Sequence, residues 1–391
     1  MSAGTLIVGA GVSGLSVALA LLKRGHAVTV LERGEVGRES SWAGGGILSP
    51  LLPWNYSEAV NALALRSMAD YANWVAEVEA LSGLSAEYWR CGMLALEVGQ
   101  VDEALAWCAA HGVEAERELP TKLPPLSPAL MELPSTRLSP QAGKSLLIAP
   151  QGGGTNSVWL PGVAQARNPR LVAALRAAVL KLAGKIHAQC GAIAVTASAG
   201  HVTAIETACG EFAAERLVLA TGAWAGLGLS GLAGVPQTRP VRGQMLLFKL
   251  EPGTLDAILY RRGLYLIPRR DGHILVGSTL EDVGFDKSTT EETRRSLQAE
   301  AASLLPQLAE MQPLQHWAGL RPGSPDNIPV IDRHPDFDNV YVNTGHFRYG
   351  VTMAPASSEL LADLIEGHTP VLDPAPYRWQ AAAERNWPMT Q

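Results

Sequence analysis

Three glycines near the start of the sequence have the spacing of a phosphate-binding turn. Gly9, Gly11 and Gly14 follow the apolar run Thr5–Val8, and apolar residues at helical spacing follow them as far as Arg24. In such a turn the first glycine allows the tight bend, the second lets a pyrophosphate approach the backbone, and the third lets the helix pack on the strand. Free N–H groups at the start of the helix then bind phosphate.

An acidic residue completes this pattern. Glu32 ends a second predicted strand, Ala27–Leu31, where its carboxylate can accept hydrogen bonds from ribose hydroxyls and would repel a 2′-phosphate. The pattern therefore argues against NADP but does not by itself separate FAD from NAD. Residues 38–47 are rich in serine, alanine and glycine. Their hydroxyls and bare backbone suit a second surface for pyrophosphate and flavin, and the alternative is a flexible surface loop.

The elements that must position these residues are distributed along the whole chain. A length of 391 residues is too great for one simple core, so we expect two intertwined lobes. The buried run Arg216–Leu219, which leads into Thr221 and Gly222, resembles a strand that returns to the nucleotide sheet. Antiparallel strands are predicted at Val241–Leu250, Leu264–Pro268 and His273–Ser278. The predicted fold class is therefore α/β, with a Rossmann-like domain interleaved with an α+β domain built on an antiparallel sheet.

The remaining predicted elements follow from periodicity and from turn residues. An irregular connection rich in proline and serine is expected over residues 119–140. Helices are predicted at Tyr56–Leu81, Asp102–His111, Asn168–Ala183, Thr290–Leu305 and Ser357–Ile365, and strands at Trp89–Leu96, Leu146–Ala149 and Asn339–Asn343.

Composition excludes several classes of protein. Lys and Arg total 31 against 37 Asp and Glu, a net charge of −6, so we expect no nucleic-acid partner. We also expect no membrane partner, because no run of eighteen apolar residues occurs, and the N-terminus lacks the basic leader and cleavage site of a signal peptide. The four cysteines have no metal-ligand spacing, so we predict no metal site and a reducing, cytoplasmic location.

Several segments together resemble the D-amino-acid-oxidase-like family of FAD-dependent oxidoreductases, and within it the glycine oxidases linked to thiamine biosynthesis. The resemblance covers nearly the whole chain in the expected order, and its most specific parts are Trp317–Pro322 and Gly345–Gly350. The carrying segments are Gly9–Gly14 with Glu32, Ser40–Leu48, Cys91–Met93, Val241–Gln244, Tyr265–Arg269, Gly277–Thr279, His316–Gly323 and Gly345–Gly350.

The resemblance implies three residues that act on the substrate. Arg321 would pair with the substrate carboxylate, because a guanidinium matches a carboxylate in a bidentate, charge-assisted contact. Tyr265 would donate a hydrogen bond to the same carboxylate, and Arg348 would be a second cation near substrate or flavin. The alternatives are an arginine holding the turn at Pro322 and Gly323, and a cross-strand core tyrosine. His346 is interpreted as a loop residue near FAD and not as a general base.

The resemblance also implies FAD, bound without a covalent link because the C-terminal third of the chain has no cysteine. It places the FAD-binding domain at residues 1–87, 160–239 and 312–391, and the substrate-binding domain at 88–159 and 240–311. Ile47 and Leu280 are expected to line the pocket. The predicted FAD contacts are Gly9, Gly11, Val12, Ser13, Gly14, Glu32, Arg33, Ser40, Ser41, Gly45, Gly46, Ile47, Ala192, Thr221, Gly222, Gly345, His346, Phe347, Arg348, Tyr349, Gly350, Val351 and Thr352.

The activity implied is oxidative deamination of a small amino acid, with glycine first and sarcosine or small D-amino acids next. Hydride transfer to flavin N5 would give an imine and then a 2-oxo acid and ammonia, and molecular oxygen would reoxidise the flavin to give H2O2. One alternative is a broader D-amino-acid or secondary-amine oxidase, or a dehydrogenase that uses a quinone. Others are a tRNA-modifying oxidoreductase domain, which would need a basic face, and a non-catalytic FAD-binding protein. The resemblance alone suggests a homo-oligomer.

Overall fold

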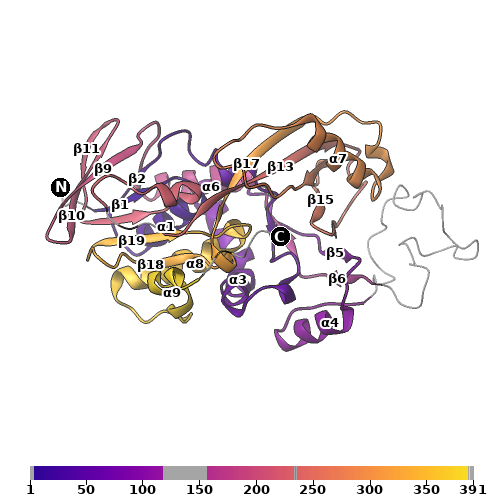
Figure 1. Cartoon of the computed structure of the whole chain (residues 1–391), viewed down its shortest axis with the longest axis horizontal. Helices are drawn as coiled ribbons and strands as arrows, with labels where there is room; N and C mark the ends of the chain where they lie inside the picture. Colours follow the sequence, from indigo (N-terminus) through magenta and orange to yellow (C-terminus); the bar gives the residue numbers. More distant parts are fainter. Residues whose placement is uncertain (1–3, 118–155, 233, 235, 386, 388–391) are drawn as a thin grey trace, which may run out of the picture.

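The computed structural model describes residues 4–117, 156–232, 234, 236–385 and 387. Two large sheets lie one after the other along the long axis of the molecule (Figure 1). One of them carries the N-terminal strand, and the other carries the long strands of the middle of the chain. Because each sheet takes strands from distant parts of the sequence, the chain crosses between them several times.

The first sheet has six strands and is the predicted nucleotide sheet. Strand β1 (Thr5–Val8) lies at its centre, parallel both to β2 (Val28–Leu31) and to β12 (Arg216–Leu219). The predicted return of the chain at Arg216–Leu219 is therefore confirmed. The order is β18 (Val330–Arg333), β19 (Val340–Thr344), β12, β1, β2 and β8 (Lys185–His187), with β18 antiparallel to β19.

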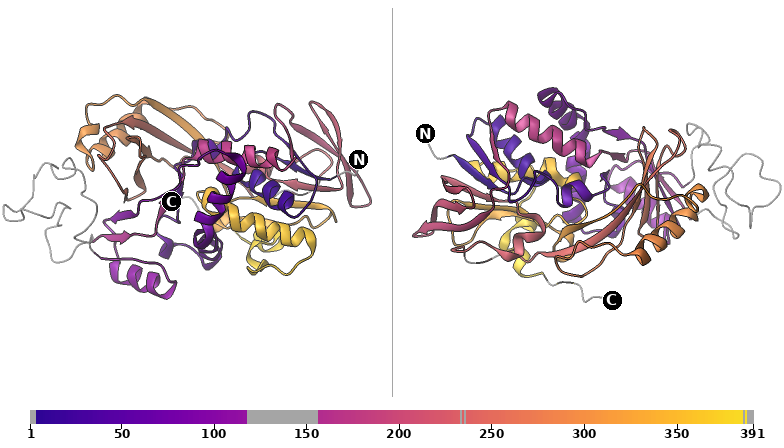
Figure 2. Two further views of the ribbon diagram at one scale, coloured as in Figure 1. Left: turned by 180° about the vertical axis from the view of Figure 1, so that it is seen from behind. Right: turned by 90° about the horizontal axis from the view of Figure 1, so that it is seen from above.

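Four long helices belong to this part of the molecule. Helix α1 (Val12–Lys23) packs against both α6 (Asn168–Lys181) and α8 (Gly350–Glu366), while α3 (Glu58–Ser82) contacts α6 and α8. Figure 2 shows α1 in indigo, α6 in magenta and α8 in yellow lying together. Their apolar faces form one core with the central strands, in which Ile7, Leu15 and Leu361 are completely buried.

The second sheet has seven strands. Its order is β17 (Gln315–Gly323), β13 (Arg239–Lys249), β16 (His273–Gly277), β15 (Leu264–Pro268), β14 (Ile258–Arg261), β5 (Met93–Leu96) and β6 (Val158–Leu160). All neighbours are antiparallel except β14 and β5. Because strand side chains alternate, Leu246 and Phe248 face α7 (Glu291–Ala302), whereas Met245 and Tyr265 belong to the core shared with the first sheet.

Smaller elements complete the described chain. Two small sheets have three strands each, in the orders β11 (Gly210–Ala213), β10 (His201–Thr207), β9 (Ala192–Ser198) and β3 (Ile47–Leu48), β7 (Ala164–Gln165), β4 (Trp89–Arg90). The shorter α-helices are α2 (Ser40–Ala43), α4 (Val101–Ala110) and α9 (Trp379–Ala383). The 3-10 helices are η1 (Pro53–Asn55), η2 (Gly222–Leu227), η3 (Pro306–Leu308), η4 (Pro325–Asn327) and η5 (Ala375–Tyr377).

Two predicted elements differ from the structure for local reasons. The single strand expected over Trp89–Leu96 is divided between two sheets at Gly92, which has φ +72°. The helix predicted at Ser357–Ile365 begins at Gly350 instead, in spite of Pro355. Proline removes the hydrogen bond that would reach back four residues to the Val351 carbonyl, but Tyr71 supplies that carbonyl with an O–H donor at 2.9 Å.

Two further observations concern the predicted boundaries. Strand β17 pairs with β13 in the seven-stranded sheet, although it falls within residues 312–391, the range predicted for the FAD-binding domain. The predicted irregular connection at 119–140 and the strand at Leu146–Ala149 lie outside the described residues.

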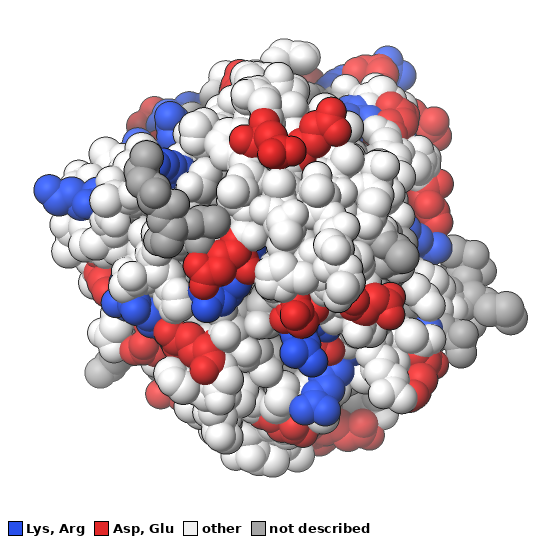
Figure 3. Space-filling model, turned by 90° about the vertical axis from the view of Figure 1, so that its left-hand side faces the viewer, with Lys and Arg blue, Asp and Glu red and all other residues white. Residues whose placement is uncertain are grey.

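The described surface agrees with the charge balance. On the face that Figure 3 shows, acidic and basic side chains are interspersed, and no broad basic patch is present among the described residues of that face. No helix in the described part of the chain combines the length and apolar character that crossing a bilayer requires.

Candidate active site

A cavity of about 360 Å³ opens between the two sheets. At one end it is lined by the glycine turn after β1 and by residues 31–33 at the end of β2. At the other end its lining includes Met245 from β13, Tyr265 from β15 and Arg321 from β17. The two sheets thus bring residues more than three hundred positions apart in the sequence to one space.

The glycine turn has the geometry that the sequence predicted. Gly9 adopts φ +107°, and a Cβ on Gly14 would lie 1.9 Å from the Gly9 carbonyl oxygen, so the helix could not approach the strand with any larger residue there. At Gly11 a Cβ would meet only the Ser41 hydroxyl, at 3.0 Å. Ser41 Oγ accepts a hydrogen bond from the N–H of Val12, the first residue of α1, at 2.9 Å. A hydroxyl therefore sits at the anion-binding end of this helix.

The carboxylate of Glu32 is fixed by backbone donors. It accepts hydrogen bonds from the N–H groups of Ala10, at 2.8 Å, and Gly34, at 3.0 Å. Each carboxylate oxygen retains a lone pair that can accept from a hydroxyl group. Beside it, the guanidinium of Arg33 lies over the ring of Trp224, 3.7 Å from its centroid. This end of the cavity therefore has a carboxylate that can accept hydrogen bonds from hydroxyl groups, beside a flat surface formed by the guanidinium and the aromatic ring.

Residues 40–47 lie between the two sheets, so the surface-loop alternative for this segment is wrong. The segment begins as the short helix α2 and ends in β3, and the Ser40 hydroxyl donates to the carbonyl of Leu320. At Gly45 a Cβ would lie 2.5 Å from Ile267 and 3.4 Å from the Tyr265 ring. Glycine is needed here because the backbone passes directly against the second sheet.

Tyr265 and Arg321 meet at the inner end of the cavity. The Tyr265 hydroxyl donates to Ser278 Oγ at 2.8 Å, and Nη2 of Arg321 donates to the same oxygen at 2.5 Å. Nη1 of Arg321 donates to the carbonyls of Thr279, at 3.1 Å, and Arg242, at 3.3 Å. All of these acceptors are neutral, so within the described chain no carboxylate pairs with Arg321.

Arg321 fits at this position because of a glycine on the neighbouring strand, which was not predicted to belong to the site. A Cβ on Gly243 would lie 2.2 Å from the Arg321 guanidinium, so the side chain of Arg321 runs across a bare backbone on the neighbouring strand. Glycine inside a strand commonly marks such a close approach, and that signal was present in the sequence. The alternative role for Arg321, at a turn, is wrong because Pro322 and Gly323 belong to β17.

Arg348 reaches the same end of the cavity from the loop between β19 and α8. The N–H of Phe347, which has φ +46°, donates to the Pro322 carbonyl at 2.9 Å and so ties this loop to the end of β17. Among the described residues, Arg348 makes no hydrogen bond or ion pair with another side chain. Burial lowers the pKa of Arg321, and the nearby charge of Arg348 lowers it further, although both guanidinium groups remain protonated at neutral pH.

His346 in this loop is not suited to act as a base. Its side chain is buried, and burial lowers its pKa to about 4 because the charged imidazolium is poorly solvated. The ring is therefore neutral at pH 7 and holds a proton only weakly. This supports the interpretation of His346 as a loop residue.

Several buried polar atoms around the cavity lack a partner in the described structure. They include both side-chain polar atoms of Asn343 and Nε2 of His346, which belong to residues that line the cavity. Buried polar groups of this kind are normally hydrogen bonded, so the lining matches a ligand with many donors and acceptors. A dinucleotide with a polar ring system has that character.

Most of the predicted site residues line the cavity, and three do not. Gly14 packs helix on strand, the Gly345 carbonyl accepts from Ser324, and Thr352 donates from Oγ1 to the Ile47 carbonyl at 3.1 Å. The lining residues are Gly9, Gly11, Val12, Ser13, Glu32, Arg33, Ser40, Ser41, Gly45, Gly46, Ile47, Ala192, Thr221, Gly222, Tyr265, Arg321, His346, Phe347, Arg348, Tyr349, Gly350 and Val351.

Two pocket positions singled out from the sequence have different locations. Ile47 lines the cavity, as expected. The expectation for Leu280 is wrong, because its side chain is 52% exposed and does not line the cavity. Leu280 follows the last strand residue of β16 and its side chain faces solvent, although the next residue, Glu281, still pairs with Arg242 on β13. Met245, Trp224 and Asn343 line the cavity and were not predicted.

The chain is similar to known proteins over nearly its whole length. A family model described as FAD dependent oxidoreductase matches residues 5–364. The chain belongs to this FAD-dependent oxidoreductase family. It is 44% identical to the glycine oxidase of Pseudomonas aeruginosa over 96% of this chain and 98% of that protein. It is 32% identical to the bifunctional protein ThiO/ThiG of Nostoc sp., over 93% of this chain and 53% of that protein.

The fold of this FAD-dependent oxidoreductase is shared with solved structures. The crystal structure of glycine oxidase from Geobacillus kaustophilus superimposes with a TM-score of 0.81 at 26% identity, covering 96% of this chain and 97% of that one. The residues around the cavity fit FAD: the glycine turn and α1 would hold the phosphates, Glu32 the ribose, and the loop His346–Gly350 the flavin. No cysteine is among the described residues that line the cavity.

Proposed function

We propose that this FAD-dependent oxidoreductase oxidises the C–N bond of a small amino acid, with glycine as the preferred substrate. The observation that carries the proposal is the pair Arg321 and Arg348, two guanidinium groups at the inner end of the cavity without a carboxylate partner among the described residues. A substrate carboxylate would supply the missing negative charge. The similarity to proteins named glycine oxidase supports the choice of substrate.

In this proposal the residues of the chain act mainly by orientation. Arg321 binds the carboxylate, Tyr265 donates a hydrogen bond to it, and Arg348 adds a second positive charge. The apolar walls formed by Ile47 and Met245 exclude water from the reacting carbon. FAD, when bound, supplies the acceptor for the hydride that leaves the α-carbon. The α-hydrogen leaves the neutral amine as a hydride, so no side chain has to remove a proton from carbon, and positioning carries most of the rate enhancement.

The overall reaction balances with water and oxygen as co-substrates. Glycine, O2 and water would give glyoxylate, ammonia and H2O2. Two electrons leave the substrate and reduce oxygen, and hydrolysis of the imine supplies the carbonyl oxygen of glyoxylate. Molecular oxygen as acceptor, a homo-oligomeric state and a cytoplasmic location are parts of the proposal. A role in thiamine biosynthesis is supported by similarity to part of the Nostoc protein named ThiO/ThiG.

The deciding experiment is anaerobic mixing of the purified yellow holoenzyme with glycine, sarcosine, D-alanine, D-proline and L-alanine. Flavin absorbance near 450 nm, the usual band of oxidised flavin, reports reduction. We expect rapid bleaching by glycine and sarcosine. Bleaching mainly by the bulkier D-amino acids would instead identify a broad D-amino-acid oxidase.

Two controls separate the remaining alternatives. Admitting air should restore the absorbance and release H2O2, whereas slow recovery in air and fast recovery with a soluble quinone would identify a dehydrogenase. A flavin that none of the five amines reduces would contradict the proposed activity and favour a non-catalytic FAD-binding protein.

A further inference from the structure

The two groups assigned to the substrate carboxylate converge on one oxygen atom. Ser278 Oγ accepts the hydrogen bonds of both the Tyr265 hydroxyl, at 2.8 Å, and Arg321 Nη2, at 2.5 Å. Ser278 does not itself line the cavity, whereas Tyr265 and Arg321 do. The serine hydroxyl therefore lies behind the two donors and sets the direction of each.

The position of Ser278 follows from the end of strand β16. Tyr265 lies opposite Gly277 in the β15–β16 register, so the next residue emerges beside the tyrosine ring. A Cβ on Gly277 would lie 3.1 Å from that ring, so the backbone already passes close to it. Position 278 therefore suits a short side chain that carries an oxygen, such as serine.

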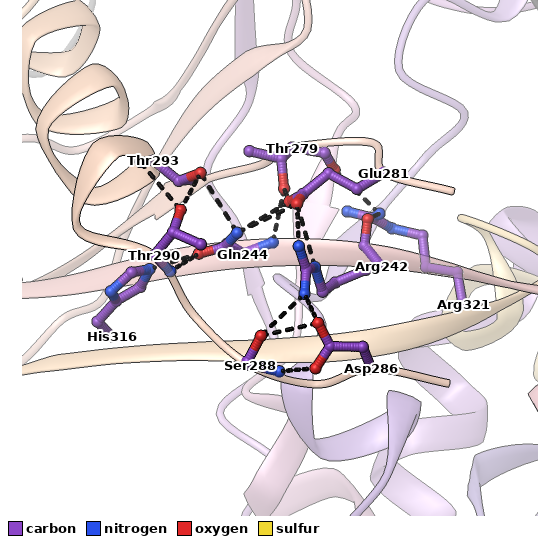
Figure 4. Close-up of polar contacts among 10 residues, drawn as sticks. All are labelled: Arg242, Gln244, Thr279, Glu281, Asp286, Ser288, Thr290, Thr293, His316 and Arg321. Carbon is purple, nitrogen blue, oxygen red and sulfur yellow. Dashed lines mark hydrogen bonds and ion pairs between the residues drawn. The ribbon is translucent and has the colours of Figure 1, made fainter. Parts of the chain in front are cut away.

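Glu281 attaches the segment that carries Ser278 to strand β13. Its carboxylate accepts from the Gln244 amide at 3.0 Å, from the Thr279 hydroxyl and from the Arg242 guanidinium at 2.5 Å. Figure 4 shows these groups converging on Glu281, with Arg321 lying beyond Thr279 and Arg242.

The network also fixes the other acceptors of Arg321. Thr279 and Arg242, the residues whose carbonyls receive Nη1 of Arg321, both bond to Glu281 through their side chains. Gln244 adds a second bond to the segment, because its N–H donates to Thr279 Oγ1 at 2.9 Å. The carboxylate of Glu281 thus controls the backbone on which Arg321 rests.

We propose that Ser278 is a positioning residue that joins Tyr265 and Arg321 into one carboxylate-binding unit, held in place through Glu281. This inference deepens the proposed function and rests on its assignment of the carboxylate site. A phenol has a single proton, so when Tyr265 donates it to a bound carboxylate the Ser278 hydroxyl turns to donate to the phenol oxygen, while it still accepts from Arg321. Without Ser278, the phenol and the guanidinium each lose this partly buried partner and gain freedom to rotate away from the substrate. Substrate binding then weakens, while the flavin site, built from other segments, is unaffected.

The test compares Ser278→Ala with Ser303→Ala in the holoenzyme. Ser303 also accepts a hydrogen bond from an arginine, Arg261, but at the exposed end of α7. Three quantities are measured: the Kd of glycolate, the KM and kcat for glycine, and the FAD content. Glycolate is a carboxylate that carries a hydroxyl in place of the amine, and its binding is followed by the change that it causes in the flavin spectrum. For Ser278→Ala we expect the Kd and KM to rise about tenfold, as for the loss of one partly buried hydrogen bond to a charged group, with kcat changed less than about threefold. The control should match the wild type.

A double-mutant cycle distinguishes positioning from general loosening of the site. If Ser278 acts through Tyr265, Ser278→Ala should weaken glycolate binding less in a Tyr265→Phe background than in the wild type. Ser278→Thr, which keeps the hydroxyl, should restore most of the affinity. Ser278→Cys, a weaker acceptor of similar size, serves if the alanine variant does not fold, and should show the same direction of effect.

Glu281→Gln tests the other half of the proposal and should raise the glycolate Kd while FAD stays bound. An unchanged Kd in Ser278→Ala or Ser278→Cys, or full additivity with Tyr265→Phe, would overturn the inference. Failure of the proposed function is recognised separately. In that case wild-type flavin is not reduced by any amino acid, whereas glycolate binding still reports on the anion site.

Discussion

Two arginines on neighbouring strands of the second sheet have opposite environments. Arg242 on β13 is 5% exposed and pairs with Glu281 and Asp286, both at 2.5 Å. Arg321, on the adjacent strand β17, donates only to neutral oxygens. The first cluster is closed, because its charges are satisfied within the chain. The second is open, because its positive charge is left for a ligand. Removing one member of a closed cluster leaves an unpaired charge behind, whereas an open cation can bind an anion from outside the chain.

Removing the open arginine should have the largest effect, and that effect should be on binding. We expect Arg321→Ala to raise the KM for glycine on the order of a hundredfold or more, since a charge-assisted bidentate contact is lost. The free energy of unfolding should change little, because no partner charge is left buried. Steady-state kinetics and urea unfolding measure the two quantities, with Arg261→Ala, a half-buried arginine outside the cavity, as the control. An unchanged KM would remove Arg321 from the carboxylate site.

The closed arginine should show the converse behaviour. Arg242→Met keeps most of the side-chain volume but leaves Glu281 without its cation, and we expect a loss of about 2 kcal/mol in the free energy of unfolding. The value is at the low end for a buried pair because both carboxylates are partly exposed. Chemical denaturation of the holoenzyme measures it. A stability equal to that of the wild type would mean that the closed cluster does not stabilise the sheet.

The smallest expected effect is on the acid side of the stability profile. Although burial alone would raise it, the hydrogen bonds from Thr279, Arg242 and Gln244 lower the pKa of Glu281 below its usual value. A lowered carboxyl pKa stabilises the fold at pH values above the unfolded pKa of about 4.3, and that stability is lost as pH falls through the folded pKa.

Glu281→Gln should therefore be less stable than the wild type at neutral pH, and its stability should fall less steeply between about pH 5 and pH 3. Urea unfolding at a series of pH values checks this, with Glu206→Gln at an exposed position of β10 as the control. Parallel profiles for Glu281→Gln and wild type would show that Glu281 does not titrate with folding.

The nucleotide end of the site could be predicted from the sequence because it is local. Gly9, Gly11 and Gly14 lie within six residues, and Glu32 follows in the next strand, so spacing alone specifies their arrangement. The return of Arg216–Leu219 to β1 could also be predicted, from its apolar run and the Thr221–Gly222 ending. A backbone that needs glycine at fixed positions can be recognised from the spacing of those glycines in the sequence.

The substrate end could not be derived in the same way. Tyr265, Ser278 and Arg321 come together only through the order β17–β13–β16–β15, which no local pattern specifies. The resemblance indicated Tyr265 and Arg321 but not Ser278, because a serine after a strand has no distinctive spacing. Leu280 was misplaced for a related reason. Its neighbours suggested a pocket residue, but its side chain faces solvent on a segment that still pairs with β13 at Glu281.

The interleaving of the two sheets has a consequence for biosynthesis. Strand β1 is made first, yet β12, its partner on one side, begins at residue 216, and β19, the next strand of that sheet, ends at residue 344. Neither sheet can close until most of the chain has left the ribosome. Such long-range pairing slows folding and exposes unpaired strand edges for longer. We therefore expect the nascent chain to depend on chaperones more than a protein of equal length built from two successive domains.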